Sequence, residues 1–236
     1  MSWLTQLPHK DSDTLMVCHQ SDGVRSLTKQ EFTEQVTRLL PTLAEFDAQG
    51  VAYQLDNTPA WCVLEAALSE LQRVAIPLPT FFTAQQIAFG LQNSGAGLFV
   101  CDRAYEGEHA KLVALVDVCK HYPLYVYQLS NTQPVPYFAN TQKITFTSGS
   151  TGTPKGVCLS LESQLQVATS LYQSIGLEKP NHLCLLPLAV LLENLAGVYA
   201  PLLAGGTVNL VPLAELGFSG AQLLEPHKLI AAIERT

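Results

Sequence analysis

The feature that most constrains how this chain folds is its alternation of short apolar runs with amphipathic, helix-like segments. The apolar runs recur through much of the 236 residues and suit buried strands. Because strands that alternate with helices usually pair in parallel, we predict an α/β fold with largely parallel sheets flanked by helices. The predicted strands are residues 51–55, 74–77, 98–101, 124–128, 183–186 and 207–211.

Helix starts are marked by capping residues. Thr28 with Glu31 and Thr83 with Gln86 have the spacing of a capping box, in which each side chain bonds the other's backbone. Thr58 precedes Pro59 and is predicted to cap a helix whose apolar residues face inward. Gly95 is expected to end the helix that follows Thr83.

A polar, proline-marked segment at 130–141 interrupts the alternation. We interpret it as a linker and as a boundary between subregions near 130–141, within one unit rather than between two independent domains. The apolar window 183–203 is broken by two prolines and by Glu193 and Asn194, so it predicts a buried strand and helix rather than a membrane span.

The charge and the cysteines exclude several classes of function. A formal net charge of −7 argues against sequence-independent binding to nucleic acid or to anionic membranes. The 6 cysteines are scattered, with no CxxC pair and no histidine at metal-ligand spacing. We therefore predict no metal site on protein ligands, and with no signal peptide recognised we expect a cytoplasmic protein with reduced thiols.

A glycine- and hydroxyl-rich stretch, 147–156, has the composition of a polyphosphate-binding loop. Glycine lets the backbone approach a ligand closely, and successive inward N–H groups form a concavity that binds anions. A Walker A loop is excluded, because Pro154 stands where its second glycine is needed and Gly156 where its magnesium-binding hydroxyl is needed. The flanks are β-rich, which favours strand, loop, strand over a flexible linker.

These residues, TSGSTGTPKGV, resemble the phosphate-binding signature of the adenylate-forming superfamily, which includes acyl-CoA synthetases, adenylation domains of peptide synthetases and luciferases. Weaker similarity extends from about residue 20 to 220. The resemblance implies the N-terminal part of an AMP-binding domain, most like long-chain acyl-CoA synthetases. It also implies an acid–thiol ligase: ATP with Mg²⁺ converts a carboxylic acid, in our interpretation a fatty acid, into an acyl-adenylate, and the thiol of CoA or a carrier protein accepts the acyl group.

The resemblance further implies roles for individual residues. Thr147 and Lys155 are expected to be catalytic, with Lys155 balancing negative charge on the departing pyrophosphate. Hydroxyls and amides of the loop are expected to hold the ATP phosphates. The implied phosphate-binding residues are Thr147, Ser148, Gly149, Ser150, Thr151, Gly152, Thr153 and Lys155.

A second segment, LPLAVLLE at 186–193, resembles the superfamily's acyl-pocket region, which often reads Leu-Pro-Leu-Ala-His with a glutamate three residues later. Glu193 fits this pattern, whereas Val190 stands where the histidine is expected. We assign both residues to the acyl pocket, since an apolar Val190 suits a hydrophobic acyl group. Two other interpretations stay open: Val190 as ordinary packing at a helix start, and Glu193 as a cap or a buried hydrogen-bonding group.

Several elements of the superfamily have no counterpart that we recognise, namely the acidic residue of Tyr-Gly-x-Thr-Glu that helps to hold magnesium, the ribose-binding aspartate, the hinge, and the C-terminal domain with its lysine. We therefore expect residues 1–236 to be an N-terminal fragment that is inactive alone. Two alternatives remain: a stand-alone nucleotide- or phosphate-binding module, and a non-catalytic interaction protein with the same fold. The fragment is also expected to self-associate through an uncovered apolar helix that carries Leu223, Leu224, Leu229, Ile230 and Ile233.

Overall fold

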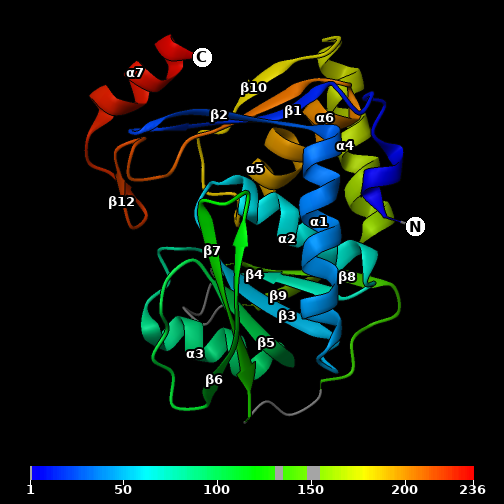
Figure 1. The fold of residues 1–236 in the computed structure, drawn as a ribbon, viewed down its shortest axis with the longest axis vertical. Coiled ribbons are helices and arrows are strands. Elements are labelled where there is room, and N and C mark those ends of the chain that lie inside the picture. Colours follow the sequence, from blue (N-terminus) through cyan, green and yellow to red (C-terminus); the bar gives the residue numbers. More distant parts are fainter. Residues whose placement is uncertain (1, 131–134, 148–154) are drawn as a thin grey trace.

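The computed structural model describes residues 2–130, 135–147 and 155–236, and it contains two main β-sheets with helices between and around them (Figure 1). The larger sheet has seven strands and the smaller has four. In spatial order, the larger sheet consists of β6 (Ala110–Val118), β7 (Tyr122–Leu129), β5 (Ala96–Cys101), β3 (Gly50–Gln54), β4 (Val74–Pro77), β8 (Thr141–Thr147) and β9 (Lys155–Ser160).

The central strands of the larger sheet, β5, β3, β4 and β8, pair in parallel. Antiparallel strands are added at both edges, with β7 beside β5, β6 beside β7 and β9 beside β8. The predicted α/β class is confirmed. Strands were predicted where β7 and β9 lie, but β6 was not predicted, nor was the antiparallel pairing at the edges. β6 escaped prediction because charged residues such as Lys111 and Asp117 interrupt its apolar pattern.

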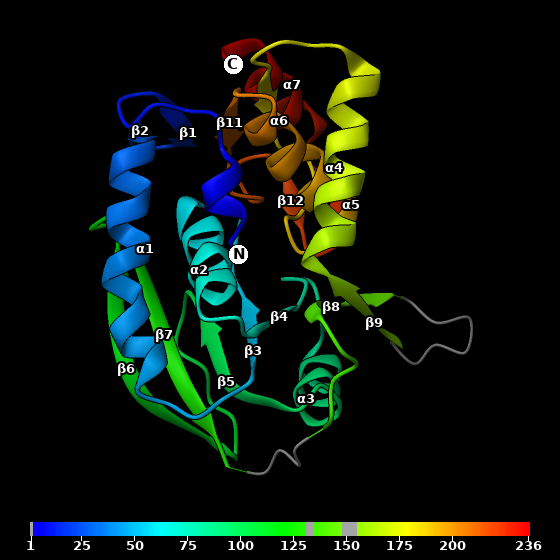
Figure 2. The ribbon, with the colours of Figure 1, turned by 90° about the vertical axis from the view of Figure 1, so that its right-hand side faces the viewer.

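Alternate residues of the central strands face two different cores. Val51 and Tyr53 point into the core that contains the apolar faces of α1 (Lys29–Ala44) and α2 (Pro59–Glu70). Ala52 and Phe99 point into the opposite core, where Ile87 of α3 (Ala84–Asn93) packs. This two-residue period explains why strands covered on both faces are apolar throughout. Helices α1, α2 and α3 are seen on either side of the sheet in Figure 2.

The helix starts follow the predicted capping chemistry in two of three cases. Both capping boxes form, at the starts of α1 and α3, and Gly95 adopts a positive φ of 68° directly after α3. Thr58 does occupy the N-cap of α2, but its side chain makes no cap hydrogen bond, so that part of the prediction is wrong. The N–H of Trp61, the third helical residue, donates instead to the Thr58 carbonyl oxygen at 3.1 Å, so it does not require a bond from the Thr58 side chain.

The smaller sheet joins residues from both ends of the chain. β1 (Thr14–Gln20) pairs with β2 (Gly23–Thr28) on one side and with β11 (Thr207–Leu210) on the other, and β10 (Asn181–Leu183) extends the sheet beyond β11. The remaining elements are η1 (Trp3–Gln6), α4 (Leu161–Ile175), α5 (Leu191–Glu193), η2 (Asn194–Tyr199), α6 (Ala200–Leu203), β12 (Phe218–Ser219), β13 (Gln222–Leu223) and α7 (Pro226–Arg235).

The strand predicted at 183–186 begins and ends earlier in the structure, where β10 spans Asn181–Leu183. Backbone groups of Leu186 and Leu188 bind the side chains of Asn57 and Glu193 instead of a neighbouring strand. Within the described residues, no helix combines the length and apolar character needed to cross a membrane.

The segment 130–141 runs from β7 to β8, two strands of the same seven-stranded sheet. The strands on either side of the predicted subregion boundary therefore share one sheet. Residues 131–134 of this segment lie outside the described residues.

Candidate functional site

Thr147 ends β8 and Lys155 begins β9, and the two residues stand opposite each other in this pair of strands, which is labelled in Figure 2. The Thr147 hydroxyl lies 3.5 Å from the Lys155 carbonyl oxygen, to which it donates, and both residues are exposed. Strands therefore flank the loop on both sides, as predicted, in place of the strand-to-helix passage of a Walker A loop. The remaining predicted phosphate-binding residues lie outside the described residues: Ser148, Gly149, Ser150, Thr151, Gly152 and Thr153.

A buried charge network anchors the strand that leads into this loop. Lys143 of β8 forms an ion pair with Glu65 of α2 and a hydrogen bond to the Asn194 side-chain oxygen. Asn194 in turn donates to the second Glu65 oxygen at 3.1 Å. Burial lowers the pKa of Lys143, and the negative charge of Glu65 partly offsets that effect. The network fixes β8 relative to α2 and η2.

Aromatic rings surround the charged end of Lys143. Its Nζ atom lies 5.1 Å from the centroid of the Tyr199 ring and 5.8 Å from that of Trp61. Both rings are buried. A cation over aromatic faces gains electrostatic stabilisation that is strongest where water is excluded, so the rings stabilise the lysine in its protonated form.

A second fixed point is Asn57, in the turn between β3 and α2. Its amide nitrogen donates to the Leu186 carbonyl oxygen at 2.8 Å, and its amide oxygen accepts from the Leu188 N–H at 2.9 Å. The neighbouring Asp56 accepts from the Leu213 N–H at 3.0 Å. This turn lies at the carboxyl end of a parallel strand, the edge at which α/β sheets bind ligands. It holds the 186–188 segment at that edge.

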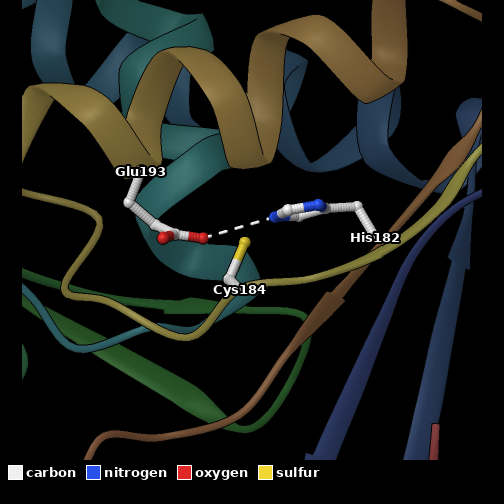
Figure 3. A group of neighbouring side chains, drawn as sticks. All are labelled: His182, Cys184 and Glu193. Carbon is white, nitrogen blue, oxygen red and sulfur yellow. Dashed lines mark hydrogen bonds and ion pairs between the residues drawn. The ribbon is translucent and has the colours of Figure 1, made fainter. Parts of the chain in front are cut away.

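Glu193 ends α5 and is buried, with both carboxylate oxygens in contact with polar groups. One oxygen accepts from the Leu186 N–H at 3.3 Å, and the other lies 3.4 Å from His182 Nε2 (Figure 3). Val190 is the N-cap residue of α5 and is half-buried. These contacts correspond to the buried hydrogen-bonding interpretation of Glu193. The assignment of both residues to an acyl pocket stays a prediction.

Cys184 completes a group of three side chains with His182 and Glu193 (Figure 3). Its thiol points toward the Gly197 carbonyl oxygen at 3.5 Å. Burial, followed by the negative charge of Glu193, raises the pKa of this thiol well above its ordinary value. Because the thiolate is the reactive form of cysteine, this Cys–His–Glu arrangement does not make a nucleophile.

Sequence reasoning missed the charge network and this three-residue group. Glu65 in the apolar helix 59–70 was detectable as a buried charge, which is rare without a partner, whereas Lys143 stands in a strand in which only Ile144 and Phe146 are apolar. No local pattern linked them to each other. His182 and Cys184 are two residues apart, but the acidic member of the group comes from the following helix.

The comparison with known proteins decides the family. The AMP-binding enzyme family matches residues 6–233, which is nearly the whole chain. The chain belongs to the AMP-binding enzyme family. The resemblance read from the loop residues is thereby confirmed, whereas a preference for long-chain acids stays a prediction.

Curated relatives of this AMP-binding chain include CoA ligases. Crotonobetaine/carnitine–CoA ligase of Escherichia coli O17:K52:H18 (strain UMN026 / ExPEC) is 27% identical over 170 residues, covering 62% of this chain and 33% of that protein. The protein of the same description from Shigella sonnei (strain Ss046) is 28% identical over the same share of both chains. The alignment thus spans about one third of the length of these relatives.

Solved structures show the same fold. O-succinylbenzoate coenzyme A synthetase from Bacillus subtilis, in complex with ATP and magnesium ion, matches with a TM-score of 0.70 and 21% identity, covering 99% of this chain and 60% of that one. Fatty acid AMP ligase from Legionella pneumophila matches with a TM-score of 0.76 and 12% identity, covering 99% and 42%. The N-terminal part of the adenylate-forming fold is therefore present.

Proposed function

We propose that this AMP-binding chain contributes to ATP-dependent activation of a carboxylic acid as an acyl-adenylate, which is then transferred to a thiol such as that of CoA. The observation that carries the proposal is the β8–β9 hairpin, which holds Thr147 and Lys155 opposite each other at the start and end of the loop. The names of the relatives and of the solved structures support the same reaction class.

The proposed chemistry places most of its demand on the leaving group. A carboxylate oxygen attacks the α-phosphorus of ATP, the bond to the β-phosphate oxygen breaks, and pyrophosphate leaves with the electron pair. Donors that are already in place stabilise that charge without reorganising during the reaction. Lys155 offers an ammonium and Thr147 a hydroxyl for this purpose.

The second step returns AMP. The sulfur of the accepting thiol attacks the acyl carbon, the bond from that carbon to the AMP phosphate oxygen breaks, and the thiol proton passes to solvent.

Magnesium, when bound with ATP, would neutralise phosphate charge. The described residues of β8 and β9 fit phosphate oxygens through Lys155 and Thr147, and they contribute no carboxylate to the metal, because neither strand contains an acidic residue.

For the substrate, we propose a hydrophobic, fatty carboxylic acid. Val190 supports this, because it puts an apolar side chain at the start of α5, where the related pattern has histidine. Glu193 holds the preceding segment through the Leu186 N–H. CoA or a carrier-protein thiol is the proposed acceptor.

The test is exchange of labelled pyrophosphate into ATP with a panel of fatty and aromatic acids, using the 236-residue chain and its Lys155→Ala variant. Lys111→Ala is a matched control, because Lys111 is also exposed and lies on β6, the opposite edge strand of the same sheet. Because residues 1–236 are expected to be inactive alone, the parent chain should show no more exchange than Lys155→Ala. If the chain is active, the reaction class predicts acid-dependent exchange that Lys155→Ala lowers at least about 100-fold, the usual cost of removing one charge-stabilising donor.

Measurable exchange that is equal in Lys155→Ala and in Lys111→Ala would contradict the role of the loop lysine. Binding of ATP without exchange would show that these residues bind the nucleotide but do not catalyse adenylate formation by themselves. No response to either ATP or pyrophosphate would instead favour a non-catalytic interaction protein.

A further inference from the structure

The group formed by His182, Cys184 and Glu193 has the composition of a transition-metal site. One ligand atom from each residue lies within 4.8 Å of the others, and the His182 Nε2 to Glu193 Oε1 distance is 3.4 Å. Tetrahedral zinc ligands at about 2.0–2.3 Å from the metal lie roughly 3.3–3.8 Å apart. The histidine–carboxylate pair already has this separation, and the sulfur needs a shift of about 1 Å or less.

Separate elements supply the three side chains and hold them in place. His182 belongs to β10, Cys184 follows that strand directly, and Glu193 ends α5, so the side chains converge between a sheet and a helix (Figure 3). Glu193 is fixed by the Leu186 N–H, and the backbone at Cys184 is fixed by a 3.0 Å bond from its N–H to the Asn209 carbonyl oxygen. The ligands are therefore largely in position before any ion binds.

Gly197 leaves the space that this group requires. A Cβ atom at this position would lie 2.4 Å from Glu193 Oε1 and 3.0 Å from His182 Nε2. Gly197 lies in η2, a π-helical turn, and turns of this kind are frequent at functional sites. The helix backbone approaches the ligand atoms closely because position 197 has no side chain.

Charge also favours a divalent cation here. A thiolate and a carboxylate together carry two negative charges, which neutralise those of Zn²⁺, while His182 binds as neutral imidazole. Binding therefore releases the Cys184 proton to the buffer. Cys184 is fully buried and Glu193 nearly so, whereas the His182 side chain is 36% exposed, which gives the ion a path from solvent.

We propose that His182, Cys184 and Glu193 form a binding site for a borderline-soft divalent metal ion such as Zn²⁺, which ties β10 to the helix that begins at Leu191. Its three protein ligands leave a fourth position for water on the His182 side. This site shares no residue with the proposed phosphate loop, and the proposal departs from the prediction from sequence that no protein ligands bind a metal.

The experiment uses the full chain, stripped of metal with a chelator and titrated with Co²⁺ and then Zn²⁺. Co²⁺ bound to a thiolate gives a charge-transfer absorption in the near ultraviolet. We expect one Co²⁺ per chain with this band, and displacement of the cobalt by Zn²⁺. Cys184→Ala should abolish the band. His182→Gln removes a ligand itself and should weaken Zn²⁺ binding by at least about 10–100-fold, because losing a residue that only supports a ligand already has an effect of that size.

Two matched controls remove a thiol or an imidazole elsewhere. Cys158→Ala removes a half-buried thiol on β9, and His227→Gln removes an exposed imidazole that lies 3.8 Å from Glu225. Both should bind Zn²⁺ as the parent chain does. Circular dichroism checks folding, and if Cys184→Ala does not fold, the half-exposed His182→Gln variant decides the result.

Three outcomes would overturn the proposal: no cobalt–thiolate band at any concentration that leaves the chain folded, a band that persists in Cys184→Ala, or equal weakening in His182→Gln and His227→Gln. The readout is metal binding alone, so a chain that fails in pyrophosphate exchange still tests this site.

Discussion

Lys143 places a positive charge among aromatic rings in the protein interior, where a charge is stable only with a partner. Its Nζ contacts Glu65 and Asn194, and all three side chains are buried. Removing one member of a buried ion pair leaves the other charge uncompensated. We predict that Lys143→Met lowers the free energy of unfolding by about 3–5 kcal/mol. Urea denaturation of the parent chain and the variant measures this difference.

The control for this prediction is the double variant Lys143→Met with Glu65→Leu, which should recover most of the lost free energy because it removes both charges. Lys111→Met on the exposed face of β6 should change the free energy of unfolding by less than about 0.5 kcal/mol. If the double variant instead loses as much free energy of unfolding as Lys143→Met and Glu65→Leu lose together when measured singly, the two charges are not coupled and the ion pair is contradicted.

Local chemistry at single residues could be predicted from sequence, whereas partners distant in sequence could not. Thr28 and Glu31 are three residues apart, and their spacing alone predicted the capping box that the structure contains. Lys143 and Asn194 are 51 residues apart, and their bond depends on how β8 and η2 pack. Thr58 shows the limit of local rules, since a favourable residue at the correct position makes no side-chain bond.

At the scale of elements, α1 and α3 begin with the same hydrogen-bond geometry but with different chemistry. Glu31 accepts from the Thr28 N–H at 2.8 Å, and the neutral Gln86 accepts from the Thr83 N–H at 2.9 Å. The Thr28 N–H and hydroxyl hold the pKa of Glu31 below its ordinary value. The bond to a carboxylate therefore depends on pH, while the bond to an amide does not.

We predict that Glu31→Ala and Gln86→Ala each lower the free energy of unfolding by about 1 kcal/mol at pH 7. Because the pKa of Glu31 is lower in the folded state, its contribution is present above the unfolded-state pKa of about 4.3 and is lost as pH falls through the folded-state value. Urea denaturation over a pH series should show the cost of Glu31→Ala fading in acid and that of Gln86→Ala constant. A parallel decline in both variants would contradict this account.

The predicted elements were most accurate where burial on both faces left a clear apolar run. β3, β4 and β5 follow the predicted strands closely, because each is covered by helices on either side. The prediction for β10 was displaced because side chains of Asn57 and Glu193 take up the backbone groups of the next residues. Those competing bonds come from other elements, so the local sequence did not reveal them.

At the scale of the whole molecule, the fold class followed from the alternation of elements, but the division into two sheets did not. β1 pairs with β11, with Met16 opposite Val208. Contacts between residues so far apart depend on the complete arrangement of helices and strands. The candidate site shows the same division: its loop was recognised from local composition, while the anchoring contacts of Lys143, Asn57 and Glu193 required the structure.

The surface around α7 leads to a prediction about assembly. Of the five apolar residues named from the sequence, Leu229 is half-buried against the core that contains Leu213 and Ala232, whereas Leu224, Ile230 and Ile233 are 61%, 55% and 52% exposed. Leu223 is also exposed, but it lies in β13, and Leu224 precedes α7, so the prediction that the helix carries these two residues is wrong. Large exposed apolar patches recruit partners. Leu229 and Ala232 pack α7 onto this core, and the exposed residues leave an apolar surface that a second copy can contact.

We predict that the chain self-associates through this surface and that Ile230→Asp with Ile233→Asp makes it monomeric. We choose Ile230 and Ile233 rather than Leu229, because an aspartate at position 229 would disrupt the packing of α7 itself. Light scattering across a concentration series gives the measurement, and Val24→Asp on β2, where the valine is 63% exposed, is the matched control for added charge. The double variant should lower the average mass while Val24→Asp leaves it unchanged; a parent chain that is monomeric at every concentration would show that α7 does not mediate association.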